Sequence, residues 1–251
     1  MYTETGSTTL VEQDPLKRVD LEDAAFSDVT RQLQFTSYYD DRLRRYFKDK
    51  KVEADFNFLQ QKFPGRQIAW SGSTKDEQKV LINVTSDVYA PDVYLFDRTT
   101  KKLVFQYTPR PKLKQYEPYL SPMQSIRYKS SDGLEIPAYF TIPKQSNGKM
   151  LPLLVFPHGG PWARDYWGMN SYAQLMANRG FVVLAPNFRG STGYGKNYLD
   201  AGNLQWGKLM QDDITWGVKY LVAKGLVDPK KVAIMGGSYG GYATLAGLIY
   251  A

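Results

Sequence analysis

The residues best suited to do chemistry lie near the C-terminal end of the 251-residue sequence, in the run Gly236-Gly237-Ser238-Tyr239-Gly240-Gly241. The run contains the pattern G-x-S-x-G centred on Ser238. A serine that attacks a carbonyl carbon must stand on a tight turn between a strand and a helix, and flanking glycines let the backbone make that turn without a side-chain clash. The pattern therefore predicts the nucleophile of a serine hydrolase. A glycine-rich turn with an ordinary serine is the alternative that the motif alone leaves open.

The segments on both sides of this motif have the composition that such a turn requires. Residues 232–235 are apolar and predict a strand, and residues 242–249 predict a buried helix. The amide groups at the start of that helix would favour negative charge beside the serine. Strand, turn and helix thus follow one another in the order that a nucleophilic serine needs.

A second glycine-rich loop could stabilise the charge that such a reaction develops. The buried-strand pattern of residues 153–156 leads directly into Pro157-His158-Gly159-Gly160-Pro161-Trp162. A tetrahedral intermediate needs two N–H donors directed at its oxyanion, and glycines leave the backbone free to approach it. We expect these donors to be the N–H groups of Tyr239 and Gly160. A plain turn punctuated by glycine and proline is the alternative.

Several further motifs accompany these two loops in a fixed order. They are Arg164-Asp165, Asn187-Phe188-Arg189-Gly190-Ser191-Thr192-Gly193-Tyr194-Gly195, Trp206-Gly207 and Met210-Gln211-Asp212-Asp213. With Ser238 and its neighbours, they make residues 152–251 resemble the prolyl oligopeptidase family of serine peptidases, in its acylaminoacyl-peptidase and dipeptidyl-peptidase-like branch. The resemblance implies a β-propeller in front of an α/β-hydrolase domain and cleavage of short peptides in a sheltered cavity.

The acid and the base of a catalytic triad are not found where this resemblance requires them. An α/β-hydrolase presents its triad in the order serine, acid, histidine, and no acid or histidine follows Ser238. The single histidine, His158, lies in the glycine loop and is expected to be structural or to lie on the oxyanion side. Asp212 and Asp213 precede the serine and are expected in the first turn of a helix, where carboxylates complement its dipole. We therefore expect a fragment of a larger enzyme that is inactive by itself.

The remaining matched positions are expected to support the cleft. His158, Gly159, Arg164, Asp165 and Arg189 fall in or beside the family-like motifs. Charged groups in such places usually fix loops through hydrogen-bonded ion pairs. Two other functions stay open: an esterase or acyl hydrolase using the same groups, and a catalytically inactive binding module.

The N-terminal part of the sequence has the pattern of short antiparallel strands. Residues 67–70, 80–84, 93–97 and 103–107 read as a four-stranded meander that suits a propeller blade, and residues 32–38 and 43–47 as part of a preceding one. Residues 52–63 have helical spacing before Pro64-Gly65. A small open antiparallel sheet is the alternative. Residues 109–122 contain four prolines and predict a linker, with a boundary near Lys114. The predicted domains are residues 1–113, as C-terminal propeller blades, and residues 114–251, as the N-terminal part of a hydrolase domain.

Beyond the linker, the elements alternate as in a parallel sheet with crossover helices. A hairpin of residues 125–129 and 134–142 turns at Ser131-Asp132-Gly133. Strand 153–156, helix 171–179, strand 181–185 and a helix from 210 to 222 follow, and Asp228-Pro229 is expected to turn the chain into the strand before Ser238. The predicted fold class is therefore α/β: a partial α/β-hydrolase domain preceded by a partial β-propeller.

Composition excludes some chemistries. The sequence has no cysteine and one histidine, which argues against disulfides, a thiol nucleophile and a zinc site, so no metal or cofactor is expected. The net charge is +7, but the lysines and arginines are scattered among 25 acidic residues. No nucleic-acid motif accompanies them, so no nucleic-acid partner is expected. No apolar run is long enough to span a membrane. The expected partner is a peptide substrate; homo-oligomerisation and a cytoplasmic or periplasmic location stay open.

Overall fold

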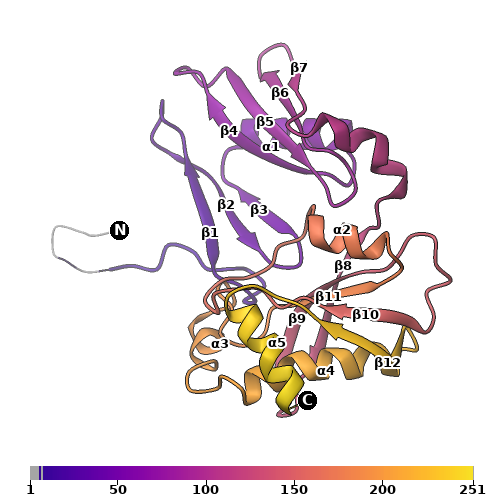
Figure 1. The fold of residues 1–251 in the computed structure, drawn as a ribbon. Coiled ribbons are helices and arrows are strands. Elements are labelled where there is room, and N and C mark those ends of the chain that lie inside the picture. The colour runs from indigo at the N-terminus through magenta and orange to yellow at the C-terminus, as the bar shows by residue number, and fades with distance from the viewer. Residues whose placement is uncertain (1–5, 7, 251) are drawn as a thin grey trace.

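The N-terminal half of the chain forms two antiparallel sheets in the computed structural model, which describes residue 6 and residues 8–250. The first sheet has the order β1-β2-β3 and the second the order β4-β5-β6-β7 (Figure 1). Their strands are β1 (Leu21–Phe26), β2 (Leu33–Tyr39), β3 (Leu43–Phe47), β4 (Gln67–Ser73), β5 (Lys79–Thr85), β6 (Asp92–Asp97) and β7 (Lys102–Tyr107). The predicted four-strand meander is confirmed, whereas β1 was not predicted.

Helix α1 (Lys50–Lys62) joins the two sheets through one apolar core. The Asp49 carboxylate caps it by accepting hydrogen bonds from the N–H groups of Lys51 and Val52, and the helix ends before Pro64-Gly65, as predicted. Its apolar face packs against alternating buried residues of the strands. The buried members of this core are Phe35, Val52, Phe56, Leu59, Ile68, Val80, Ile82, Val84 and Phe96.

The proline-containing connection between the two halves is helical, which corrects the prediction of an irregular linker. Residues Pro111–Tyr119 form the 3₁₀ helix η1, with Pro111 at its start. Proline is tolerated in the first turn of a helix because the N–H that it lacks would have no partner there. The predicted boundary at Lys114 lies inside η1, so the connection is a structured segment.

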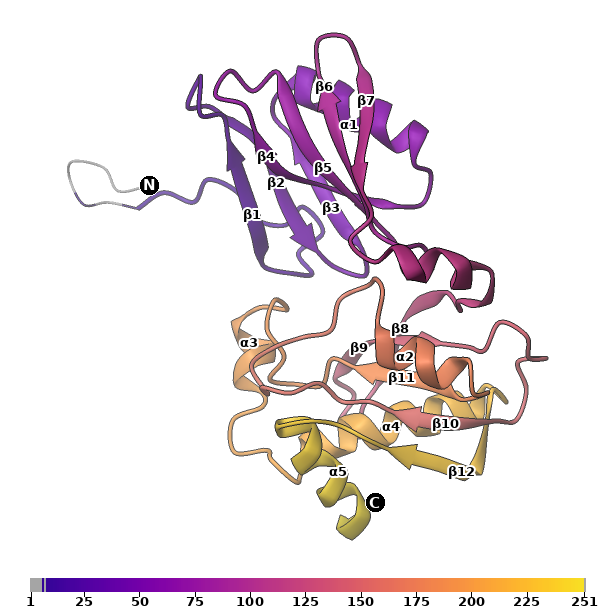
Figure 2. The ribbon, with the colours of Figure 1, turned by 45° about the horizontal axis from the view of Figure 1, so that its top comes forward.

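The C-terminal half contains a five-stranded mixed sheet of order β12-β10-β11-β9-β8. The hairpin of β8 (Met123–Lys129) and β9 (Glu135–Thr141) pairs antiparallel with β11 (Val182–Pro186), as Figure 2 shows. Strand β10 (Leu151–Val155) lies parallel between β11 and β12 (Val227–Ile234). The chain is therefore a mixed α/β protein, and the predicted parallel strands with crossover helices are confirmed.

Strand β12 is longer than predicted because it continues through Asp228-Pro229. It lies at the edge of the sheet and pairs only with β10, with a register shift between Leu151 and Leu153. Proline lacks the N–H that a central strand needs, but an edge strand with an irregular register accommodates it. The expected turn at this position is thus an irregularity within one strand.

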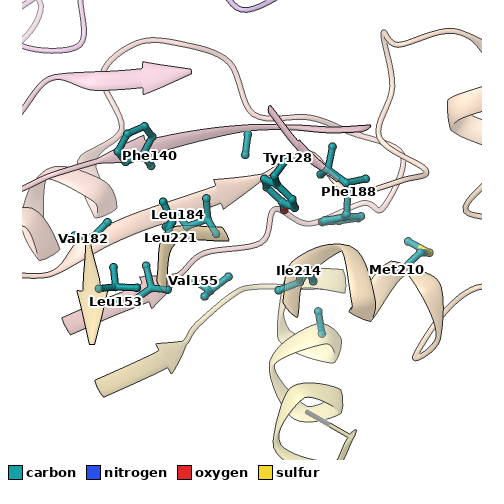
Figure 3. Close-up of a cluster of buried hydrophobic side chains, with 14 of the residues drawn as sticks. Tyr128, Phe140, Leu153, Val155, Val182, Leu184, Phe188, Met210, Ile214 and Leu221 are labelled. Atoms are coloured by element: carbon teal, nitrogen blue, oxygen red, sulfur yellow. The ribbon is translucent and has the colours of Figure 1, made fainter. Parts of the chain in front are cut away.

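Helices cover both faces of the mixed sheet. Helix α2 (Ser171–Ala177) lies over Leu154 and Val183 on one face. Helices α4 (Leu209–Ala223) and α5 (Tyr239–Tyr250) cover the other face, where Leu153, Val155, Val182 and Leu184 join the main core (Figure 3). Neighbouring residues of β10 thus point in opposite directions, as the pleat of a strand requires. A short helix, α3 (Lys196–Asp200), was not predicted.

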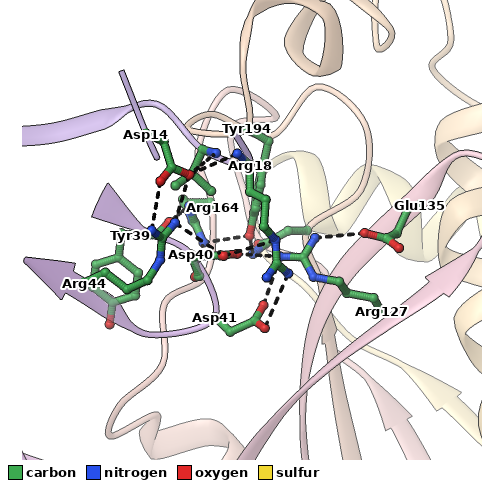
Figure 4. Close-up of polar contacts among 12 residues, drawn as sticks. Asp14, Arg18, Tyr39, Asp40, Asp41, Arg44, Arg127, Glu135, Arg164 and Tyr194 are labelled. Carbon is green, nitrogen blue, oxygen red and sulfur yellow. Dashed lines mark hydrogen bonds and ion pairs between the residues drawn. The ribbon is translucent and has the colours of Figure 1, made fainter. Parts of the chain in front are cut away.

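Residues at the turn between β2 and β3 make polar contacts with the C-terminal half (Figure 4). Arg164 donates hydrogen bonds to the backbone carbonyls of Tyr39 and Asp40 at 2.7 and 3.2 Å. The Asp40 carboxylate, which is 4% exposed, pairs with Arg18, Arg44 and Arg127. The two halves are therefore joined by buried polar contacts in addition to the connecting segment.

Candidate active site

The loop that carries Gly159 and the turn that carries Ser238 meet at the carboxyl ends of two neighbouring strands, β10 and β12. The connections that follow these two strands run to opposite faces of the sheet. Strands β10 and β12 are parallel neighbours, so their carboxyl ends lie side by side. The chain leaves β10 towards α2 on one face and leaves β12 towards α5 on the other. In open α/β sheets, such a reversal opens a crevice at the carboxyl ends of the strands, where ligands bind.

Ser238 occupies a sharp turn between β12 and α5. Its φ of +55° is unusual for a residue with a side chain. A Cβ on Gly236 would lie 2.6 Å from the carbonyl carbon of Gly240, and one on Gly240 would lie 2.2 Å from the carbonyl oxygen of Pro157. Only glycine fits at these two positions. The turn therefore has the geometry that the sequence predicted for Ser238, whose side chain is exposed.

The glycine loop after β10 lies directly against this turn. A Cβ on Gly159 would come within 3.3 Å of the Ser238 Cβ and 3.8 Å of its Oγ. The next residue, Gly160, has a φ of +127° and is exposed. Tyr239 begins α5, and the first N–H groups of a helix lack carbonyl partners within it. The structure thus brings His158, Gly159 and Gly160 to the same place as Ser238 and Tyr239.

A cluster of aromatic rings packs against both the Gly159 loop and the Ser238 turn. The Tyr239 side chain is 3% exposed, and its ring centroid lies 5.1 Å from that of Phe188 and 4.8 Å from that of Trp206. Phe188 in turn stacks on His158 at 4.4 Å. Burial raises the pKa of the Tyr239 hydroxyl above its ordinary value. The sequence indicated Phe188 and Trp206 only as parts of motifs, and the structure shows them as supports of the two loops.

His158 uses both of its ring nitrogens within the fold. Nδ1 lies 2.7 Å from the Gly159 carbonyl oxygen, and Nε2 lies 2.9 Å from the Ser191 Oγ. Burial lowers the pKa of the imidazole to about 4, so the ring is neutral at pH 7. Because a carbonyl only accepts, Nδ1 carries the proton. The single proton of the Ser191 hydroxyl lies between two acceptors, Nε2 and the Phe188 carbonyl oxygen, which is 2.6 Å from Oγ. Neither nitrogen is directed to Ser238.

Arg164 lies between the two halves of the chain, and its neighbour Asp165 is held within the C-terminal half. Besides its contacts with the β2–β3 turn, Arg164 donates to the Tyr194 hydroxyl at 2.6 Å. The Asp165 N–H donates to the Asn187 Oδ1 at 2.7 Å, and burial raises the pKa of the Asp165 carboxyl to about 6. Arg164 therefore links the loop that follows Gly160 to the N-terminal sheets, a wider connection than the sequence predicted.

The Arg189 guanidinium forms no hydrogen bond with the Ser238 turn. Arg189 joins the segment after β11, helix α4 and the β8–β9 hairpin. Its guanidinium bonds both oxygens of Asp213, which is fully buried on α4, and both oxygens of Asp132 in the β8–β9 hairpin. Hydrogen bonds from Arg189 lower the pKa of Asp132 to about 2. Asp213 thus holds Arg189 and does not simply complement a helix dipole, while Asp212 accepts a hydrogen bond from Ser131 at 2.8 Å.

Two kinds of feature are absent from the part of the chain that the structure describes. No group of three or more histidine, cysteine, aspartate or glutamate side chains there is arranged to hold a metal ion. No helix in residues 8–250 has the length and apolar character needed to cross a membrane.

Comparison with known proteins defines the class to which this fold and site belong. The prolyl oligopeptidase family matches residues 167–249. Dipeptidyl aminopeptidase BIII of Pseudoxanthomonas mexicana is 39% identical over 98% of this chain, and dipeptidyl peptidase family member 6 of Caenorhabditis elegans is 35% identical over 78% of it. The solved structure of Pyrococcus horikoshii acylaminoacyl peptidase covers 93% of the chain with a TM-score of 0.66 at 22% identity. The chain belongs to the prolyl oligopeptidase family, as its resemblance indicated.

The matched proteins are longer than this chain. It spans 36% of the length of dipeptidyl aminopeptidase BIII and 29% of that of the Caenorhabditis elegans relative. It likewise covers 36% of the acylaminoacyl peptidase structure.

Proposed function

We propose that this chain carries the nucleophile and the oxyanion-binding groups of a serine-type peptidase that acts on short peptides. The observation that carries the proposal is the contact between the two loops, in which the Cβ position of Gly159 lies 3.8 Å from the Ser238 Oγ. A nucleophile and an oxyanion-binding loop must lie this close because both act on one carbonyl group.

Each group has a defined step in the proposed reaction. The Ser238 Oγ forms a bond to the carbonyl carbon of the substrate, and the N–H groups of Tyr239 and Gly160 bind the resulting oxyanion. The amide C–N bond then breaks, the amine leaves with a proton, and water hydrolyses the acyl-enzyme. Gly159 lets the oxyanion-binding loop lie close to Ser238. The contact between Phe188 and Tyr239 holds the first turn of α5, which follows the serine.

The proposed general base and its acid are not among these 251 residues. His158 is the only histidine, and its nitrogens contact Gly159 and Ser191. A base with a pKa of about 4 would also be a weak proton acceptor for a serine at neutral pH. We therefore expect the 251-residue polypeptide to be inactive by itself, since losing one triad member lowers turnover by several orders of magnitude.

We assign the two halves to the domains that the sequence predicted. The meander β4–β7 and the sheet β1–β3 fit two C-terminal blades of a β-propeller, within residues 1–113. The mixed sheet and its helices fit the N-terminal part of an α/β-hydrolase domain, within residues 114–251. The names of the two dipeptidyl peptidase relatives support short peptides as the substrate class.

The test compares residues 1–251 with the product of the complete reading frame that contains them. We expect the longer polypeptide to hydrolyse a dipeptidyl p-nitroanilide, and both Ser238→Ala in that polypeptide and the 251-residue chain to show no turnover. Ser71→Ala in the same polypeptide serves as the control and should keep full turnover, because Ser71 is exposed on β4 and lies outside both glycine loops. Full turnover by the Ser238→Ala variant would refute the proposal. Turnover of esters without turnover of any peptide amide would favour an esterase.

A further inference from the structure

A groove separate from the serine loops lies between η1 and α2. Figures 1 and 2 show the helical turns that follow β7 beside α2. The groove has a volume of about 490 Å³. It is lined by Arg110, Leu113, Tyr116, Tyr119, Leu120, Met169, Ser171, Gln174, Leu175, Asn178 and Arg179. Met169 lies at the far end of the loop that carries Gly159, and the other lining residues lie outside both serine-site loops, so the groove is a distinct feature of the fold.

The floor and walls of the groove are apolar and aromatic. Leu113 and Leu120 come from η1 and its end, and Leu175 comes from α2. The rings of Tyr116 and Tyr119 are each 54% exposed, and Leu175 is 48% exposed. Large apolar side chains gathered along one open groove mark an interaction surface more often than single exposed ones do. The groove therefore suits an apolar side chain flanked by polar groups.

The charged side chains that line the groove are all positive. Arg110 and Arg179 lie on it, and no acidic residue lines it. The Arg110 guanidinium donates to the Ser171 hydroxyl at 3.4 Å, and that of Arg179 donates to the Leu175 carbonyl at 3.0 Å. The acidic residue of η1, Glu117, is turned away because its carboxylate accepts from the Ala90 N–H at 2.8 Å. Within the described residues, neither arginine forms a salt bridge, so both remain able to bind an anion.

Other lining groups favour a peptide over an acyl chain. The hydroxyls of Tyr116 and Tyr119 and the amide of Asn178 can exchange hydrogen bonds with backbone N–H and C=O groups. Gln174 cannot serve in this way, since its amide already bonds the backbone of Ser121 and Asp87. A simple fatty acid has no backbone N–H or C=O groups with which these hydroxyl and amide groups could pair.

We propose that this groove binds a short peptide through its C-terminal end. An apolar C-terminal side chain occupies the floor between Leu113 and Leu175, and the terminal carboxylate is held by Arg110 and Arg179. Guanidinium groups bind a planar carboxylate with paired hydrogen bonds, which gives the groove its preference for a free C-terminus. Binding in this groove does not require the chemistry at Ser238.

The experiment measures the affinity of a labelled peptide. The probe is fluorescein-Gly-Ser-Leu-Phe with a free carboxylate, followed by fluorescence anisotropy on the Ser238→Ala chain so that no hydrolysis occurs. We expect Arg110→Glu, Arg179→Glu and a C-terminally amidated probe each to weaken binding by about tenfold or more. The matched control, Lys112→Glu, changes the charge of η1 outside the groove and is expected to alter affinity by less than about twofold.

The remaining outcomes decide against the proposal. Equal affinity for the free and amidated probes, or unchanged binding by both arginine variants, would overturn it. Displacement of the probe by dodecanoate at a lower concentration than by the unlabelled peptide would assign the groove to a lipid-like ligand instead. If either charge reversal lowers the melting temperature, Arg110→Gln and Arg179→Gln replace it, with an expected loss of about threefold or more.

Discussion

A Cβ atom on Gly240 would lie 2.2 Å from the carbonyl oxygen of Pro157, so the first turn of α5 and the end of β10 meet backbone to backbone. Gly240→Ala must push these segments apart. We expect a loss of about 1–3 kcal/mol or more in the free energy of unfolding, measured by urea denaturation. Any peptidase turnover of the product of the complete reading frame should fall by more than its unfolded fraction explains, because Ser238 moves away from the Gly159 loop.

Gly237→Ala is the matched control for that substitution. It lies in the same motif, but a Cβ there meets nothing within 4 Å and its φ is not in the left-handed region. We expect it to change the unfolding free energy by less than about 0.5 kcal/mol. Equal effects of the two substitutions would mean that the contact with Pro157 does not hold the turn.

Removing Arg189 should be among the most damaging substitutions of a charged residue in this chain. Arg189→Met leaves the Asp213 carboxylate, whose side chain is 0% exposed, without its guanidinium partner. We expect a loss of about 3–5 kcal/mol in unfolding free energy. Lys196→Met breaks an exposed pair with Asp200 and should cost less than about 1 kcal/mol. If both variants unfold at the same urea concentration, the buried pair is not a major stabilising contact.

Arg164 should couple the melting of the two halves. Arg164→Gln removes charged donors from the Tyr39 and Asp40 carbonyls, at an expected cost of about 1.5–3 kcal/mol. Because those bonds cross between the halves, we expect calorimetry to resolve two transitions in the variant and one in the original chain. Arg31→Gln alters an exposed pair with Asp28 and should leave a single transition. One unchanged transition in Arg164→Gln would show that other contacts carry the coupling.

His158 should make stability fall as the solution is acidified. The pKa of its imidazole is lowered by burial from 6.5 to about 4, so folding favours the neutral ring. The stabilisation is present above about pH 6.5 and is lost as the pH falls towards 4, by roughly 2 kcal/mol between pH 7 and pH 5. The measurement is the difference in unfolding free energy between the original chain and His158→Gln at these two pH values.

The carboxyl of Asp165 titrates in the same range with the opposite sign. Burial raises its pKa to about 6, so its protonation favours the folded state as the pH falls. Subtracting the His158→Gln curve removes this contribution, because both proteins contain Asp165. As His158 is the only histidine, its ring protons also report its pKa directly by NMR, and a value near 6.5 in the folded chain would contradict the prediction.

The serine turn could be predicted because its information is local. An apolar strand, two glycines around Ser238 and an apolar helix all lie within about twenty residues, and the structure has them in that order. The parallel strands were predictable for the same reason, since buried strands and amphipathic helices alternate along the chain. Local spacing thus identified the elements that carry Ser238 and Gly160.

The contacts between the halves could not be predicted in this way. Arg164 and Asp40 are 124 positions apart, and no periodic pattern links them. Strand β1 was missed because its burial pattern lacks a regular alternation, so its pairing with β2 defines it. Arg189 was expected to support the cleft, but its partners Asp132 and Asp213 lie 57 and 24 positions away, and only the folded chain shows which loops it joins.

The fit of Gly240 against Pro157 also affects how sequence variation at this site should be interpreted. Every single-nucleotide change in a glycine codon that alters the residue adds a side chain or stops translation, so each accessible substitution meets the same steric barrier. Persistence of this glycine through evolution would then reflect the shape of the turn whether or not the protein retains hydrolytic activity. Inactive descendants of such an enzyme could keep the whole glycine pattern and lose only the serine.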